Sequence, residues 1–77
     1  MASADIVRMA NQIADFFAVS GHDEAVVGIA GHIRNFWDPR MRRELYAHAD
    51  SGGEDLAPLV IDAVAALKQA DVTASAG

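Results

Sequence analysis

Apolar side chains recur at helical spacing along four stretches of the chain, and no stretch shows the strict alternation typical of a strand. The spacing predicts helices over roughly residues 4–20, 22–37, 39–49 and 56–70. We therefore expect an all-α fold, a small compact bundle of four helices. The apolar faces are, in chain order, Ile6, Met9, Ala10, Ile13, Phe16 and Phe17; Val26, Ile29, Ala30, Ile33 and Trp37; Met41, Leu45 and His48; Leu56, Leu59, Val60, Ala63 and Leu67.

Short polar stretches separate the predicted helices. Asp38 is expected to cap the third helix, with Pro39 in its first turn. After that helix, Gly52 or Gly53 can adopt the left-handed conformation. Asp55 is the expected cap of the fourth helix.

The end of the chain is small and polar. We expect residues 71–77 to form a frayed tail. The prediction is one helical domain over 1–77, ordered from 4 to 70.

Composition narrows the class of protein. The 77 residues carry 11 acidic and 6 basic side chains, a net charge of −5, which disfavours general nucleic-acid binding. The absence of cysteine excludes disulfides and thiolate metal sites. No apolar run approaches the roughly 20 residues of a membrane span, and the start of the chain lacks signal-peptide features. We expect a soluble, cytoplasmic protein without a nucleic-acid or membrane partner.

The residues that usually carry catalysis form no recognisable pattern. His22, His32 and His48 lack the spacing that sets two metal ligands on one helix face. There is no phosphate-binding glycine motif and no serine with a neighbouring histidine and acid. The chain is therefore not expected to be an independent enzyme or to hold a metal.

Positive charge, in contrast, is concentrated. Four of the six basic residues fall within residues 34–43: Arg34, Arg40, Arg42 and Arg43. A helical wheel places Arg42, Arg43 and Tyr46 opposite the apolar face of the third helix, and Arg40 lies at its flank. A cation in the first turn of a helix costs about 0.3–1 kcal/mol, so helix stability does not require this arrangement.

Three interpretations of these arginines remain open. They pair with the acids of the chain itself or are simply solvated, they bind a partner protein, or they hold a phosphate group. A fourth interpretation, a nucleic-acid-binding helix-turn-helix built from the second and third helices, is weaker than these three. Residues outside 34–43 carry ten acids and two bases, which would repel a phosphate backbone. Trp37 shares the apolar face of the second helix and is assigned to the core.

Three segments together resemble a known family: MANQIADFF (9–17), HDEAVVGIAGHIRNFWDPRMRREL (22–45) and GGEDLAPLV (52–60). They are similar, in order and spacing, to the delta subunit of NAD-dependent, molybdenum-containing formate dehydrogenases. The resemblance extends from residue 9 to about residue 67. Gly21 stands where the family often has proline, and Asp55 where glycine is common.

The resemblance implies a non-catalytic subunit that acts in assembly, stability or cofactor maturation of the large catalytic subunit. The complex would carry bis-molybdopterin guanine dinucleotide, iron–sulfur clusters, flavin and NAD, with none bound by this chain. Alternatives are a phosphate- or nucleotide-binding maturation factor for the molybdenum cofactor and a generic helical interaction module. Self-association of the isolated chain is also open.

Two sets of residues follow from the pattern and the resemblance together. The expected partner-binding residues are Arg34, Arg40, Arg42, Arg43 and Tyr46. The expected signature or core residues are His32, Phe36, Trp37, Pro39 and Met41. No catalytic residue is assigned.

Overall fold

Four α-helices and a short 3-10 turn make up the secondary structure of the computed structural model, which describes residues 3–76. The helices are α1 (Ser3–Phe17), α2 (His22–Phe36), α3 (Pro39–Asp50) and α4 (Pro58–Ala76), and the turn η1 (Ala18–Ser20) follows α1. No strand occurs within residues 3–76, so the predicted all-α fold is confirmed. The first three helices agree with their predicted ranges to within three residues at each end.

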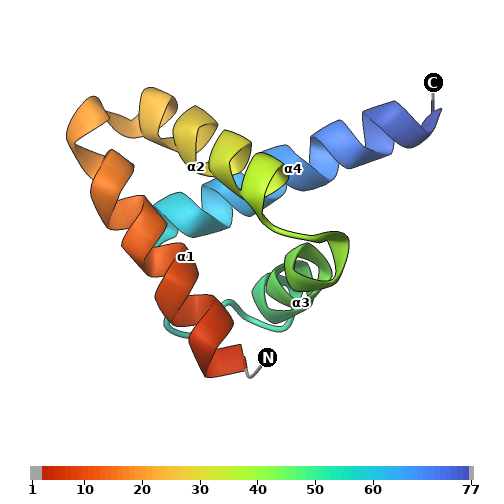
Figure 1. Ribbon diagram of the computed structural model, residues 1–77, viewed down its shortest axis with the longest axis horizontal. Helices are drawn as coiled ribbons and strands as arrows, with labels where there is room; N and C mark the ends of the chain where they lie inside the picture. Colours follow the sequence, from red (N-terminus) through yellow and green to blue (C-terminus); the bar gives the residue numbers. More distant parts are fainter. Residues whose placement is uncertain (1–2, 77) are drawn as a thin grey trace.

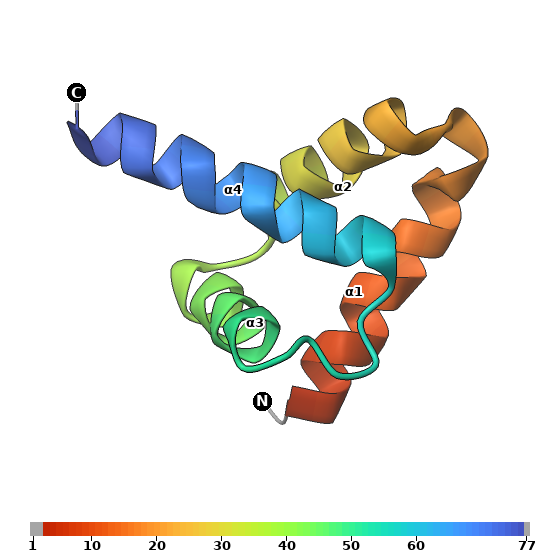
Figure 2. The ribbon, with the colours of Figure 1, turned by 180° about the vertical axis from the view of Figure 1, so that it is seen from behind.

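Helices α2 and α4 cross each other and form the centre of the molecule (Figure 1). Helix α1 contacts both of them, and α3 lies against α1 and α4. Seen from behind, the segment between α3 and α4 crosses the lower half of α1 before it rises to the start of α4 (Figure 2). The C-terminal end of α4 extends past the other helices in both views.

The core draws on all four helices. Its buried members are Ile6, Ala10, Ala14, Ile29, Ile33, Trp37, Leu45, Leu56, Val60, Ala63, Val64 and Leu67. Trp37 is only 8% exposed, which confirms its predicted place in the core. One predicted apolar position differs outright, because Phe16 is 75% exposed, whereas the other predicted apolar positions are buried or half-buried.

The turn between α2 and α3 follows the prediction from the sequence. Trp37 leaves the helix in an extended conformation, and Asp38 caps α3 by accepting the Met41 backbone N–H at 2.9 Å. Pro39 is the first residue of α3, where a missing N–H donor costs nothing. This tight turn fixes the direction in which α3, and with it the arginines, leaves the core.

The predicted cap of α4 is wrong. Asp55 has a φ of 66°, and α4 begins only at Pro58. Asn11 of α1 accounts for the delay, because its side chain donates to the Asp55 carbonyl at 2.8 Å and accepts the Ala57 N–H at 2.9 Å. These two bonds hold the segment in a non-helical path, with His48 in hydrogen-bond contact with the Glu54 carbonyl at 2.7 Å.

The end of α4 also differs from the prediction. The helix continues to Ala76 instead of ending near residue 70. Because alanine and other small residues of this stretch are compatible with helix, low hydrophobicity alone does not end the element. Gly77, the last residue of the predicted tail, lies outside the described residues.

The two glycines inside α2 serve different purposes. A Cβ atom on Gly28 would lie 2.5 Å from the Phe17 ring, so this position is glycine because the ring packs directly on the helix. A Cβ atom on Gly31 would meet nothing within 4 Å. Tight packing therefore explains the first glycine and not the second.

This contrast predicts opposite effects of one substitution at two positions. Gly31→Ala should raise the free energy of unfolding by about 0.5–1 kcal/mol, because alanine favours helix and the space is open. Gly28→Ala should be less stable than Gly31→Ala by about 1–3 kcal/mol, because the Phe17 ring must move. Urea unfolding followed by circular dichroism measures both. Equal stabilisation by the two variants would show that the ring does not constrain position 28.

Candidate docking surface

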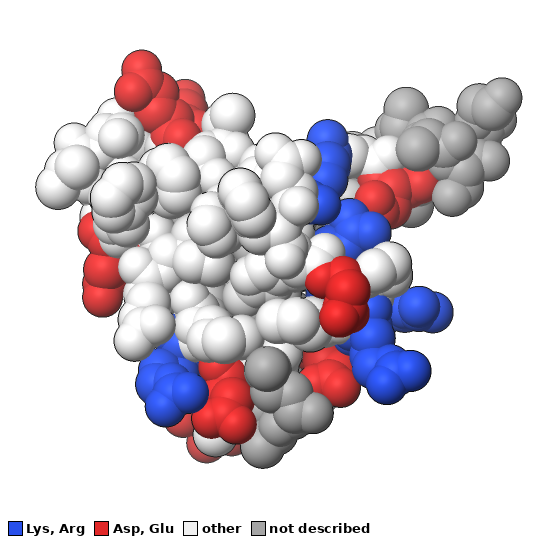
Figure 3. All heavy atoms as spheres, in the orientation of Figure 1, with Lys and Arg blue, Asp and Glu red and all other residues white. Residues whose placement is uncertain are grey.

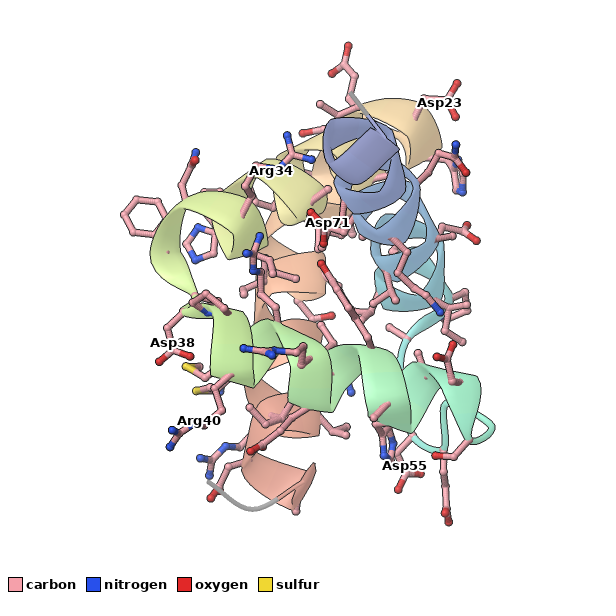
Figure 4. All side chains as sticks on the ribbon, turned by 90° about the vertical axis from the view of Figure 1, so that its right-hand side faces the viewer. Asp23, Arg34, Asp38, Arg40, Asp55 and Asp71 are labelled. Carbon is pink, nitrogen blue, oxygen red and sulfur yellow. The ribbon has the colours of Figure 1, made fainter. Side chains whose placement is uncertain are left out.

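The predicted arginine surface divides into two parts in the structure. Arg40 and Arg43 lie exposed in the first turn and a half of α3, and the Arg43 Nε donates to the Pro39 carbonyl at 3.3 Å. Arg34 lies near Asp71 of α4, and Arg34 and Arg42 both lie near Tyr46 of α3, whose hydroxyl contacts the same Asp71. Figure 4 shows Arg34 and Asp71 close together at the top, with Arg40 well below them.

Tyr46 does not lie on an outer face, contrary to the prediction. Its hydroxyl donates to Asp71 Oδ2 at 3.2 Å, and its ring packs against the core. Burial and then the negative charge of Asp71 raise the pKa of Tyr46, while the positive charges of Arg42 and Arg34 oppose that rise. The helical wheel failed here because α3 is packed on two sides, by α1 and by α4.

Arg42 is likewise half-buried and not freely exposed. Its Nε atom is buried and has no hydrogen-bond partner among the described residues. A buried donor without an acceptor costs about 1–3 kcal/mol. The local packing therefore leaves part of this guanidinium unsatisfied.

The four arginines stand apart from the other cations of the chain. Arg8 pairs with Asp5 at 3.1 Å, and Lys68 pairs with Asp50 at 2.6 Å. Within the described part of the chain, none of the four arginines forms an ion pair with a carboxylate. For the described residues, the interpretation that they pair with acids of the chain itself is therefore wrong, and the interpretation that they are simply solvated stays open.

An apolar groove lies between α1 and α2. It encloses about 540 Å³. Its lining residues are Met9, Gln12, Ile13, Phe16, Phe17, His32 and Trp37. Figure 3 shows the middle of this face free of charged side chains, with Lys and Arg side chains gathered on the right, where Asp and Glu side chains lie among them, and also present at the lower left. We call this feature the α1–α2 groove.

Some of the predicted signature residues are buried in the protein and others are exposed on its surface. Trp37 is buried, and Met41 is half-buried against the core. Phe36, however, is 74% exposed, so within this set it is not a core residue. It stands one helical turn beyond His32, and the two rings are in contact with centroids 4.8 Å apart. No other described element covers that side of α2, which explains the exposure.

Sequence reasoning missed the groove as a feature. The available signal was the width of the apolar face of the first helix, where Phe16 and Phe17 are adjacent and cannot both enter one core. Phe17 packs on α2, and Phe16 points away into solvent at the groove. An apolar face wider than its partner helix can cover is therefore the signal to look for.

Two further features bear on function. Over residues 4–71, whose side chains are described, no group of three His, Asp or Glu residues is arranged to hold a metal ion. Of the helices in the described part, none combines the length and apolar character needed to cross a membrane.

The fold and this surface define a small all-helical protein with an apolar groove and a set of arginines without carboxylate partners among the described residues. Comparison with known families then makes the assignment specific. The family model described as NADH-dependant formate dehydrogenase delta subunit FdsD matches residues 5–64, and the chain belongs to this family. No curated protein and no solved structure matches the chain significantly. The matched region contains all four arginines and both walls of the α1–α2 groove.

A separate charged cluster ties the two central helices together. His22, at the start of α2, is 2.9 Å from Asp23 and 2.7 Å from Asp62 of α4 through its two ring nitrogens. Hydrogen bonds to Asp23 and Asp62 raise the pKa of His22 above 6.5. The protonated ring can donate to both carboxylates at once, and the neutral ring cannot.

This cluster makes folding stability depend on pH. The pKa of His22 is raised in the folded chain. The stabilisation that this cluster gives the fold is therefore fully present below pH 6.5 and is lost as the pH rises through the raised pKa. The melting temperature of the wild type should exceed that of His22→Gln more at about pH 6 than at about pH 8.5. Asp62→Asn should also reduce this pH-dependent difference. An equal difference at both pH values would contradict a proton-linked contact.

Proposed function

We propose that this chain is a non-catalytic accessory subunit that docks onto the large catalytic subunit of formate dehydrogenase and acts in its assembly and stability. Family membership supports an association with that enzyme. The observation that carries the proposal is the set of arginines without carboxylate partners among the described residues: Arg34, Arg40, Arg42 and Arg43.

Physical reasoning connects this observation to docking. Arg40, Arg42 and Arg43 lie near the positive end of α3, where a cation is unfavourable by about 0.3–1 kcal/mol in the free chain. Carboxylates on a partner would remove that cost and add charge-assisted hydrogen bonds. Arginine is also among the residues enriched at the energetic centres of protein interfaces. In the free chain these positive charges therefore lack carboxylate partners among the described residues, and carboxylates of a binding partner would stabilise them.

The same arginines also support a second candidate, binding of a cofactor phosphate during maturation of the large subunit. The buried Arg42 Nε without a partner is the specific observation in its favour, because phosphate oxygens are good acceptors for a guanidinium. Asp71 and Tyr46 beside Arg42 weigh against it, since a carboxylate at the same place repels phosphate. Docking of a protein is therefore the stronger candidate.

Charge reversal of the two exposed arginines tests the proposal. Arg40→Glu/Arg43→Glu should weaken co-purification with the large subunit about tenfold or more, equivalent to at least about 1.4 kcal/mol of binding energy. Helical content by circular dichroism should stay unchanged, because both side chains are exposed and only the Arg43 Nε makes a hydrogen bond. Affinity should also fall with added salt in the wild type.

The matched control is Arg8→Glu/Lys68→Glu, which changes the net charge by the same amount on other faces of the molecule. Its co-purification should match that of the wild type. If the two double variants lose the large subunit to the same extent, only net charge matters and the arginine surface is not the docking site. Titration of the wild type with a guanine nucleotide separates the second candidate: saturable binding that Arg42→Ala abolishes favours the phosphate role over protein docking.

A further inference from the structure

Two phenylalanines at the α1–α2 groove have most of their surface in water: Phe16 lines the groove, and Phe36 contacts the groove residue His32. Phe16 is 75% exposed and Phe36 is 74% exposed. The groove walls are mostly apolar, and the Phe17 ring, which lines the groove, packs on Gly28 of α2. Large aromatic side chains exposed together beside a groove are typical of binding surfaces.

Charge is distributed unevenly around this groove. Arg40 follows the groove residue Trp37 by three positions and points to the left-hand side of Figure 4, the side on which the front face of Figure 1 lies. Asp38 is an acidic side chain at the same border, and its Oδ1 accepts a hydrogen bond from the Met41 N–H. The border next to α3 therefore offers a partner exposed guanidinium groups and a carboxylate that is already capping a helix.

The size of the groove bears on its occupant. A groove of about 540 Å³ between two helices has room for several large side chains from one helical face. Because the chain has a net charge of −5, a partner with carboxylates gains attraction only where the arginines are concentrated. The apolar walls of the groove and the positive charge of the arginines therefore favour binding at the same end of the groove.

We propose that the α1–α2 groove binds an amphipathic helix of the large catalytic subunit, whose apolar side chains enter the groove and whose carboxylates meet Arg40 and Arg43. The inference rests on the proposed function and adds the kind of segment that is recognised. The arginines set the orientation of that helix, because its acidic end must lie next to the start of α3.

Exposed positions allow a test that spares the core. Phe16→Glu/Phe36→Glu introduces two charges at the groove and should lower co-purification with the large subunit at least about tenfold. The control, Val19→Glu/Val27→Glu, replaces valines that are 91% and 72% exposed and do not line the groove. It should retain wild-type binding. Both variants should keep the helical content of the wild type, because all four side chains lie largely outside the core.

The outcomes separate this inference from the proposed function. If the groove variant binds normally while Arg40→Glu/Arg43→Glu does not, the groove inference is overturned and the docking proposal stands. If the wild type itself fails to bind the large subunit, both fail. If the isolated wild type forms a dimer that the groove variant dissociates, with binding to the large subunit unchanged, the groove is a self-association surface and the inference is again overturned.

A crosslink identifies the chemistry of the occupant. Benzoylphenylalanine introduced at position 16 of the full chain, irradiated in the complex, should attach to a helical segment of the large subunit. The recovered peptide should carry large apolar residues at helical spacing together with Asp or Glu. A peptide rich in Lys and Arg, or one without helical apolar spacing, would overturn the proposed occupant.

Discussion

The packing of α2 against α4 is the constraint on which the rest of this molecule depends. Ile29 and Ile33 of α2, and Val60 and Leu67 of α4, are fully buried. Ala63 is also fully buried, and a small side chain lets two crossing helices approach closely. The His22 contact to Asp62 joins the same pair of helices at the surface. Once α2 and α4 are paired, α1 and α3 have defined sides on which to pack.

The arginine-rich start of α3 follows from that pairing. Trp37 ends α2 inside the core, and the cap formed by Asp38 turns the chain sharply into α3. The first turns of α3 are therefore displayed next to the uncovered side of α1 and α2. One short turn thus brings charged and apolar surface together, and the family match includes all of it. This turn therefore positions the residues of the proposed docking surface.

Much of the fold could be predicted from the sequence, because local signals and core packing agree in it. The cap at Asp38 and the burial of Trp37 are cases where the pattern and the structure coincide. The prediction failed where contacts between residues far apart in the sequence determine the local structure. Asn11 moves the start of α4 by holding Asp55 from a distance of 44 residues, and no local pattern contains that information.

The candidate site could be predicted only in part, because part of it also depends on contacts between helices. The exposure of Arg40 and Arg43 follows from helical periodicity, whereas Tyr46 turns toward Asp71 because a second helix covers that side of α3. The α1–α2 groove depends on the spacing between two helices and on Phe17 resting on Gly28. Periodicity describes one helix at a time, so a groove formed between two helices lies beyond its reach.

Hydroxyl-radical footprinting of this chain, alone and bound to the large catalytic subunit, tests the central claim most directly. It reports the solvent exposure of individual side chains in the intact complex. The account predicts that oxidation of Phe16 and Phe36 falls strongly on binding, while oxidation of Ile61, which is 43% exposed on α4, stays the same. Protection of Ile61 with unchanged oxidation of Phe16 and Phe36 would contradict it.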